Sequence, residues 1–137
     1  MGRKKLKKIW LVLMVITTII IIADFTNRWI QWYYPPLPID FITSKEAVQK
    51  LNESTQKLVN IGNNHTVTWF IMKHPENGTI ETDKTIEQFI NHYGWDFKEK
   101  AGSGLIFEKN NEQLIVSTQM WTSRYVLVKI PSYFESN

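Results

Sequence analysis

Three histidines are the side chains best suited to acid–base or metal chemistry in this chain, which has no cysteine. They are His65, His74 and His92, and none has the short spacing that places two metal ligands on one helix face. His65 and His74 bracket a predicted strand, so we expect them near its opposite ends. The sequence therefore predicts surface histidines, with no metal site, no cofactor and no catalytic residue.

Two other patterns could carry chemistry. Glu81, Asp83 and Glu87 cluster near the start of a predicted helix, where carboxylates stabilise a helix N-terminus. Glycosidase chemistry would need two carboxylates facing one cleft, and nothing in the sequence indicates a cleft. The Gly102-Ser-Gly104 segment precedes a strand, whereas a phosphate-binding loop precedes a helix. We expect a turn there, and we expect that the protein is not an enzyme.

The aromatic residues are the most distinctive feature, with six Trp, five Tyr and seven Phe. Trp121, Arg124 and Tyr125 surround the last predicted hairpin turn, and these residue types dominate interface hot spots. Side chains at turns are often exposed, so the sequence predicts a partner-binding patch here. The competing interpretation is packing in the core or on the sheet. Tyr133 and Phe134, near the end of the chain, are further candidates for the same patch.

The strand before that turn alternates polar and apolar side chains. Ser117 and Gln119 fall between apolar neighbours, which predicts that one face of the sheet is partly polar and open. Gln119 is therefore a further candidate for partner binding.

Length and charge limit the number of domains and the kind of partner that the chain can have. A chain of 137 residues allows one modest domain with an appendage. Five of the 16 basic residues lie in positions 1–8, so residues 9–137 carry 11 basic and 13 acidic side chains. This balance argues against a basic nucleic-acid-binding domain.

Residues 9–34 are predicted to form a transmembrane helix with an outer aromatic belt. The uncharged apolar run covers residues 9–23, which spans roughly 22 Å as a helix. A bilayer core is about 30 Å thick, and the stems of Lys7 and Lys8 extend the apolar length at one end. At the other end, interfacial aromatic residues follow the run. They are Trp29, Trp32, Tyr33 and Tyr34.

The basic residues set the predicted topology. Residues 1–8 form a basic tail that should stay in the cytoplasm, which places the C-terminal part outside the cell membrane. Residues 35–42 are a proline-rich linker, and residues 43–137 form the extracytoplasmic domain. One alternative is a cleaved signal peptide, although cleavage after Ala23 would leave Ile21 at a position that favours small residues. The other alternative is a buried helix of a soluble protein.

The exported part is predicted to be an α+β domain, with two helices packed on a curved antiparallel sheet of four to five strands. The first helix covers residues 44–61 and begins with a capping box from Thr43 to Glu46. The second covers residues 83–93 and is capped by Thr82 or Asp83. The strands are predicted at residues 66–73, in a short segment at 95–98, and at 105–109, 113–121 and 125–130.

These features predict a single-pass membrane-anchored protein that presents a small extracytoplasmic binding or accessory domain. Its expected partners are the membrane and another membrane or envelope protein, with no nucleic acid and no evident small-molecule substrate. One alternative is a small membrane protein that acts through its transmembrane helix, where Thr17 and Thr18 are the polar side chains available for helix contacts. A secreted protein or enzyme is the other alternative.

Overall fold

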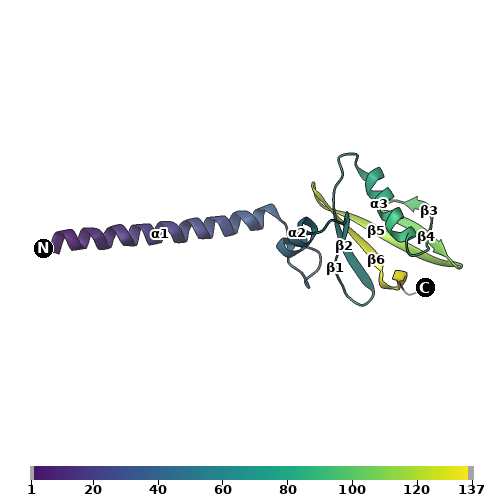
Figure 1. Cartoon of the computed structure of the whole chain (residues 1–137), viewed down its shortest axis with the longest axis horizontal. Coiled ribbons are helices and arrows are strands. Elements are labelled where there is room, and N and C mark those ends of the chain that lie inside the picture. The colour runs from purple at the N-terminus through teal and green to yellow at the C-terminus, as the bar shows by residue number, and fades with distance from the viewer. Residues whose placement is uncertain (1, 136–137) are drawn as a thin grey trace. The chain divides into compact units, whose positions relative to one another are not determined.

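The chain forms two compact units, which meet between Pro35 and Pro36 (Figure 1). A computed structural model describes residues 2–135, without the side chains of Lys4 and residues 27–33. The first unit is one helix, α1 (Gly2–Tyr33). The second unit, called the domain here, contains two further helices and one antiparallel sheet.

The apolar part of α1 is long enough to cross a membrane. Its membrane-compatible segment is Lys5–Thr26, which has 22 residues, and none of it is buried in the structure. At about 1.5 Å per residue it spans roughly 33 Å, close to the thickness of a bilayer core. The segment therefore reaches beyond the uncharged run of residues 9–23 at both ends, where it includes Leu6 and Phe25 as well as charged side chains.

The threonine hydroxyls of α1 bond within the helix. Thr17 Oγ1 donates to the Met14 carbonyl at 2.9 Å, and Thr18 Oγ1 donates to the same carbonyl at 2.7 Å. Thr26 Oγ1 donates to the Ala23 carbonyl at 2.9 Å. These hydroxyls are thus satisfied without a neighbouring helix, as an apolar environment requires.

The domain has the predicted α+β class, but its sheet has six strands rather than four to five. The strand order is β1-β2-β6-β5-β4-β3, and all neighbours are antiparallel. The elements are α2 (Ser44–Glu53), β1 (Leu58–Asn63), β2 (Val67–Lys73), α3 (Thr79–Asn91), β3 (Asp96–Ala101), β4 (Gly104–Lys109), β5 (Glu112–Thr122), β6 (Tyr125–Pro131) and the 3-10 helix η1 (Ser132–Glu135).

The additional strand is β1, and the prediction of one helix over residues 44–61 is wrong in its second half. The capping box is confirmed, since Thr43 Oγ1 accepts from the Glu46 N–H and the Glu46 carboxylate accepts from the Thr43 N–H. Helix α2 ends early because Ser54 is extended, with φ −86° and ψ 145°. The β-branched Val59 then pairs opposite Ile71 of β2, and this sheet pairing outweighs the helical spacing of the apolar residues.

Helix α3 begins four residues before its predicted start. Its N-cap is Gly78, which has a φ of 71° and no side-chain cap, so the predicted caps are wrong. Thr82 lies inside the first turn, where its hydroxyl donates to the Gly78 carbonyl at 3.3 Å. Glycine adopts this positive φ without steric cost, which lets the chain turn into the helix directly after Asn77.

The predicted hairpins at the end of the chain are confirmed. Asn110 and Asn111 have φ values of 51° and 65°, the left-handed conformation that a tight hairpin turn needs. Strands β5 and β6 then pair from Ser117 opposite Lys129 to Thr122 opposite Tyr125.

The core lies between α3 and one face of the sheet. Ile86 and Ile90 of α3 are fully buried against apolar side chains of the strands. Phe134 from η1 is also fully buried, and its backbone carbonyl accepts a hydrogen bond of 3.0 Å from Trp95 Nε1. Its ring lies 4.9 Å from that of Tyr93. The prediction that Phe134 contributes to a surface patch is therefore wrong, because this ring completes the core.

The opposite face of the sheet is covered by α2 and by residues 36–43. On this face Trp69, Ile71 and Leu127 are buried. Phe41 packs so closely on Gly62 of β1 that a Cβ at Gly62 would lie 2.4 Å from the ring. The predicted linker thus packs on the domain, with Phe41 lying over β1.

Candidate functional site

One end of the domain brings together three segments that are far apart in the sequence. We call it the entry end, because the chain enters the domain there, and it comprises Pro36, residues 74–80 and residues 120–125. Trp121 Nε1 donates a long hydrogen bond of 3.4 Å to the Pro36 carbonyl. The His74 N–H donates to the Arg124 carbonyl at 2.7 Å. These two bonds connect the β5–β6 turn to the entering chain and to the loop before α3.

The structure places the predicted patch residues Trp121, Arg124 and Tyr125 together at the entry end. The rings of Trp121 and Tyr125 are 5.9 Å apart and tilted by 38°. Tyr125 is only 8% exposed, whereas Trp121 is half-buried and Arg124 is exposed. Tyr125 therefore packs beneath the surface of the turn, and the solvent-accessible surface there is formed by Trp121 and Arg124.

A bulge shapes the turn. The register of β5 against β6 shifts between Met120 and Thr122. Thr122 Oγ1 accepts a hydrogen bond of 3.1 Å from the Arg124 N–H, which closes the two-residue turn. A bulge of this kind strengthens the local twist and redirects the side chains beside it.

Strand β5 is longer than its neighbour β4. Strand β4 pairs with β5 only as far as Ser117, and Thr118 adds one backbone bond of 2.9 Å to Ser103. Gln119 and Met120 lie beyond this point, on the outer border of the sheet, and both are exposed. The predicted residue Gln119 is thus beside the turn, on the sheet face opposite α3, together with the half-buried Ser117.

Sequence reasoning missed two apolar residues of the entry end. Ile80 is 79% exposed and Met120 is 53% exposed, the two highest values for large hydrophobic side chains in described residues 36–135. Ile80 belongs to the first turn of α3, which the helical spacing of residues 86–93 did not reveal. Met120 sits in an alternating strand, and only the short length of β4 shows that it is uncovered.

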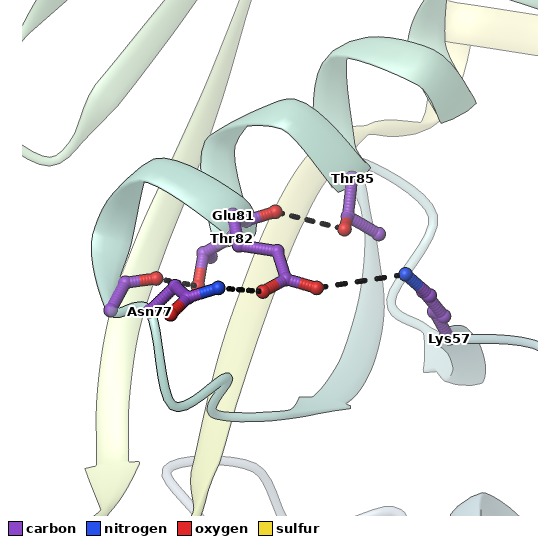
Figure 2. Close-up of polar contacts among 6 residues, drawn as sticks. Lys57, Asn77, Glu81, Thr82 and Thr85 are labelled. Atoms are coloured by element: carbon purple, nitrogen blue, oxygen red, sulfur yellow. Dashed lines mark hydrogen bonds and ion pairs between the residues drawn. The ribbon is translucent and has the colours of Figure 1, made fainter.

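A pocket of about 270 Å³ lies beside the entry end, between the end of α2, β2 and α3. Leu51, Met72 and Pro75 supply apolar lining, and Lys57, Lys73 and Glu81 supply charge. Figure 2 shows the Glu81 carboxylate between its two partners. Lys57 Nζ is 3.7 Å away on one side, and Asn77 Nδ2 donates at 3.4 Å on the other.

Several polar groups in and beside this pocket form hydrogen bonds or ion pairs within the domain. The Thr82 hydroxyl donates to the Gly78 carbonyl, and the Thr85 hydroxyl donates to the Glu81 carbonyl at 2.9 Å (Figure 2). The Glu81 side chain joins the start of α3 to Lys57 just before β1. The arrangement links three elements and offers no activated nucleophile or paired acid and base.

The histidines are separated in space as in sequence. His65 has a φ of 71° in the β1–β2 turn, and His74 follows β2, so the two bracket that strand. His92 caps the end of α3. Within residues 2–135, no three His, Asp or Glu side chains come close enough to hold a metal ion.

The predicted membrane-interface residues belong to the first unit and its boundary. Lys7 and Lys8 are exposed on α1, and Tyr34 is half-buried. The side chains of Trp29, Trp32 and Tyr33 lie outside the described part of the structure, so the predicted aromatic belt stays a prediction.

No family model matches this chain, and neither a curated protein nor a solved structure does.

Proposed function

We propose that this chain is a single-pass membrane protein whose N-terminus stays in the cytoplasm and whose domain acts outside the membrane as a binding or accessory module. The observation that carries the proposal is the 22-residue segment Lys5–Thr26 of α1, which is long and apolar enough to cross a membrane and is unburied. Exposing such a surface to water would be strongly unfavourable, whereas a bilayer would cover it.

A binding role is favoured over catalysis by the open part of the sheet. Ile115 is 49% exposed on β5, and Ser117 and Gln119 lie on the same face. A mixed surface of this kind, with an apolar centre and polar surroundings, suits contact with another protein. The proposed partner is a second membrane or envelope protein.

The first experiment tests topology. Because the chain has no cysteine, single variants Gly2→Cys and Asn111→Cys each give one labelling site. In intact cells, a membrane-impermeant maleimide should label Asn111→Cys and should label Gly2→Cys only after permeabilisation. Signal sequences share the length and composition of α1, so the mass of the purified chain is measured as well. A chain that begins near Asp24 would reject the anchor.

The second experiment tests the binding surface. A photo-crosslinking amino acid at Gln119 should give a single adduct in cells, whereas the same residue at Asn111, in the turn at the other end of β5, should give none. Replacing Lys5–Thr26 with an unrelated apolar helix should leave the adduct intact. Loss of function with the adduct intact would favour the alternative in which the protein acts through its helix.

A further inference from the structure

We propose that the entry end of the domain rests on the lipid surface of the membrane, with Ile80 and Met120 as its apolar contacts. The inference rests on the proposed function, because it requires that α1 anchors the chain. It adds a second, surface attachment that orients the domain and leaves the open face of β4 and β5 for a partner.

The covalent chain keeps the entry end near the membrane. The membrane-compatible segment ends at Thr26, and α1 continues for seven residues to Tyr33, a rise of about 10 Å. The three residues from Tyr33 to Pro36 add at most about 11 Å when fully extended. Pro36 therefore lies within about 20 Å of the end of that segment. The Pro36 carbonyl is bonded to Trp121, so the β5–β6 turn is also within a short tether of the anchor. A short tether raises the effective concentration of this surface at the bilayer without any new contact.

The chemistry of the entry end suits a lipid headgroup region. Residues 120–123 carry no charge, and the exposed Met120 is the first of them. Trp121 beside it is half-buried, and tryptophan favours the boundary between hydrocarbon and water. Lys73 and Arg124 are exposed next to this surface, with Glu76 opposing them, and cations there are attracted to anionic headgroups.

Ile80 makes the surface broader than the turn alone. The bond from the His74 N–H to the Arg124 carbonyl holds the loop before α3 against the turn. Ile80, a few residues further on, is the most exposed large hydrophobic side chain of the described domain. Two separate elements therefore each present an uncovered apolar side chain at the end to which the anchor is attached.

The opposite end of the domain has a different character. The β4–β5 turn consists of Asn110 and Asn111. Asp96 and Glu112 beside it are exposed acidic side chains, whereas Glu108 is paired with Lys98 at 3.0 Å. Acidic side chains are repelled by an anionic surface. The contrast between the two ends favours lipid, rather than a partner protein, as the occupant of the entry end.

The test uses spin labels on the full-length chain in nanodiscs that contain neutral and anionic phospholipids. The reporting variants are Ile80→Cys and Met120→Cys, both at exposed positions where the label should not disturb the fold. Matched controls are Ile115→Cys on the open face and Asn111→Cys at the opposite end. Ile19→Cys reports on α1. For each label, the collision rate is measured with oxygen, which is enriched in lipid, and with a nickel chelate, which stays in water. The ratio of the two rates reports whether the label lies in lipid.

We expect the oxygen-to-nickel ratio at Ile80→Cys and Met120→Cys to be several-fold higher than at Asn111→Cys and Ile115→Cys. If Ile19→Cys is in lipid but the two entry-end labels match Asn111→Cys, the inference is overturned while the anchor stands. Entry-end labels shielded from both reagents would indicate a protein contact and would also overturn it. If Ile19→Cys itself is not in lipid, the proposed function fails.

Discussion

The two faces of the sheet are closed in different ways. One face is sealed by α3 and by bulky side chains that are fully buried, among them Trp95, Phe107 and Phe134. The other face is covered over β1 and β2 by α2 and by residues 36–43, and it is open over part of β5. The difference separates two tasks. The α3 face stabilises the fold, whereas the opposite face packs on the entering chain and leaves part of β5 exposed, which is the surface we propose for binding.

The largest effect should come from the sealed face. Phe107 is fully buried, and its ring lies 5.6 Å from that of Phe97. Phe107→Ala should lower the free energy of unfolding by about 3–5 kcal/mol, because it removes a large apolar side chain and leaves a cavity. Urea denaturation of the full-length protein in nanodiscs, followed by tryptophan fluorescence, measures this loss.

The matched variant on the other face is Ile115→Ala. Ile115 is 49% exposed on β5, so its truncation should cost less than about 1 kcal/mol. Equal losses for the two variants would contradict the division between a stabilising face and a binding face.

The contact between residues 36–43 and β1 should give the next largest effect. Gly62 has a φ of 138°, and a Cβ there would lie 2.4 Å from the Phe41 ring. Gly62→Ala should cost about 1–3 kcal/mol, because it combines a strained backbone with overpacking. Denaturation in the same nanodiscs measures the cost.

Two further variants separate strain from overpacking. Gly102 also has a positive φ, of 60°, but no atom lies within 4 Å of its added Cβ. Gly102→Ala should therefore show the backbone cost alone. Combining Gly62→Ala with Phe41→Ala should cost less than the sum of the two single changes, because the clash needs both side chains. Simple additivity would mean that Phe41 does not pack on Gly62.

Much of the fold could be predicted because its signals are local. The Asn110-Asn111 turn, the alternation in β5 and the capping box at Thr43 each depend on a few neighbouring residues. Strand β1 could not be predicted in this way. Its apolar residues continue the helical spacing of α2, and only pairing with β2 makes the segment extended.

The candidate site was only half predictable for the same reason. Residue types at the last turn indicated Trp121 and Tyr125, but the bond from Trp121 to Pro36 joins positions 85 residues apart. Ile80 reached the surface because α3 begins at Thr79, and this start follows from Gly78 rather than from helical periodicity. Long-range contacts and backbone conformations of this kind leave no pattern in a single sequence.

A smaller effect is expected where the entering chain meets the turn. Trp121→Phe keeps an aromatic ring beside Tyr125 but removes the donor to the Pro36 carbonyl. Because this hydrogen bond is long, its loss should cost only about 0.5 kcal/mol. The local consequence should be clearer, since residues 36–42 should become more sensitive to a soluble protease in nanodiscs.

Tyr133→Phe is the matched control for that experiment. It also removes one donor, from the Tyr133 hydroxyl to the Gln113 carbonyl at 3.0 Å, but at the opposite end of the domain. Its effect on proteolysis of residues 36–42 should be negligible. Equal protease sensitivity in both variants would show that the Trp121 bond does not hold the entering chain.

The smallest effect should depend on pH, at the start of α2. The backbone N–H of Thr43, and then its hydroxyl, donate to the Glu46 carboxylate and lower its pKa below the ordinary value of 4.5. A lowered pKa in the folded state favours folding above the ordinary value, and this contribution is lost as the pH falls through the lowered pKa. Amide exchange at Ala47 and Val48 should therefore accelerate in that acidic range.

Glu46→Gln should remove the pH dependence, whereas Thr43→Val, which keeps the backbone donor, should retain part of it. An unchanged acid response in Glu46→Gln would assign the effect to another group, and α2 would then be held by its packing on β1 and β2 rather than by its cap.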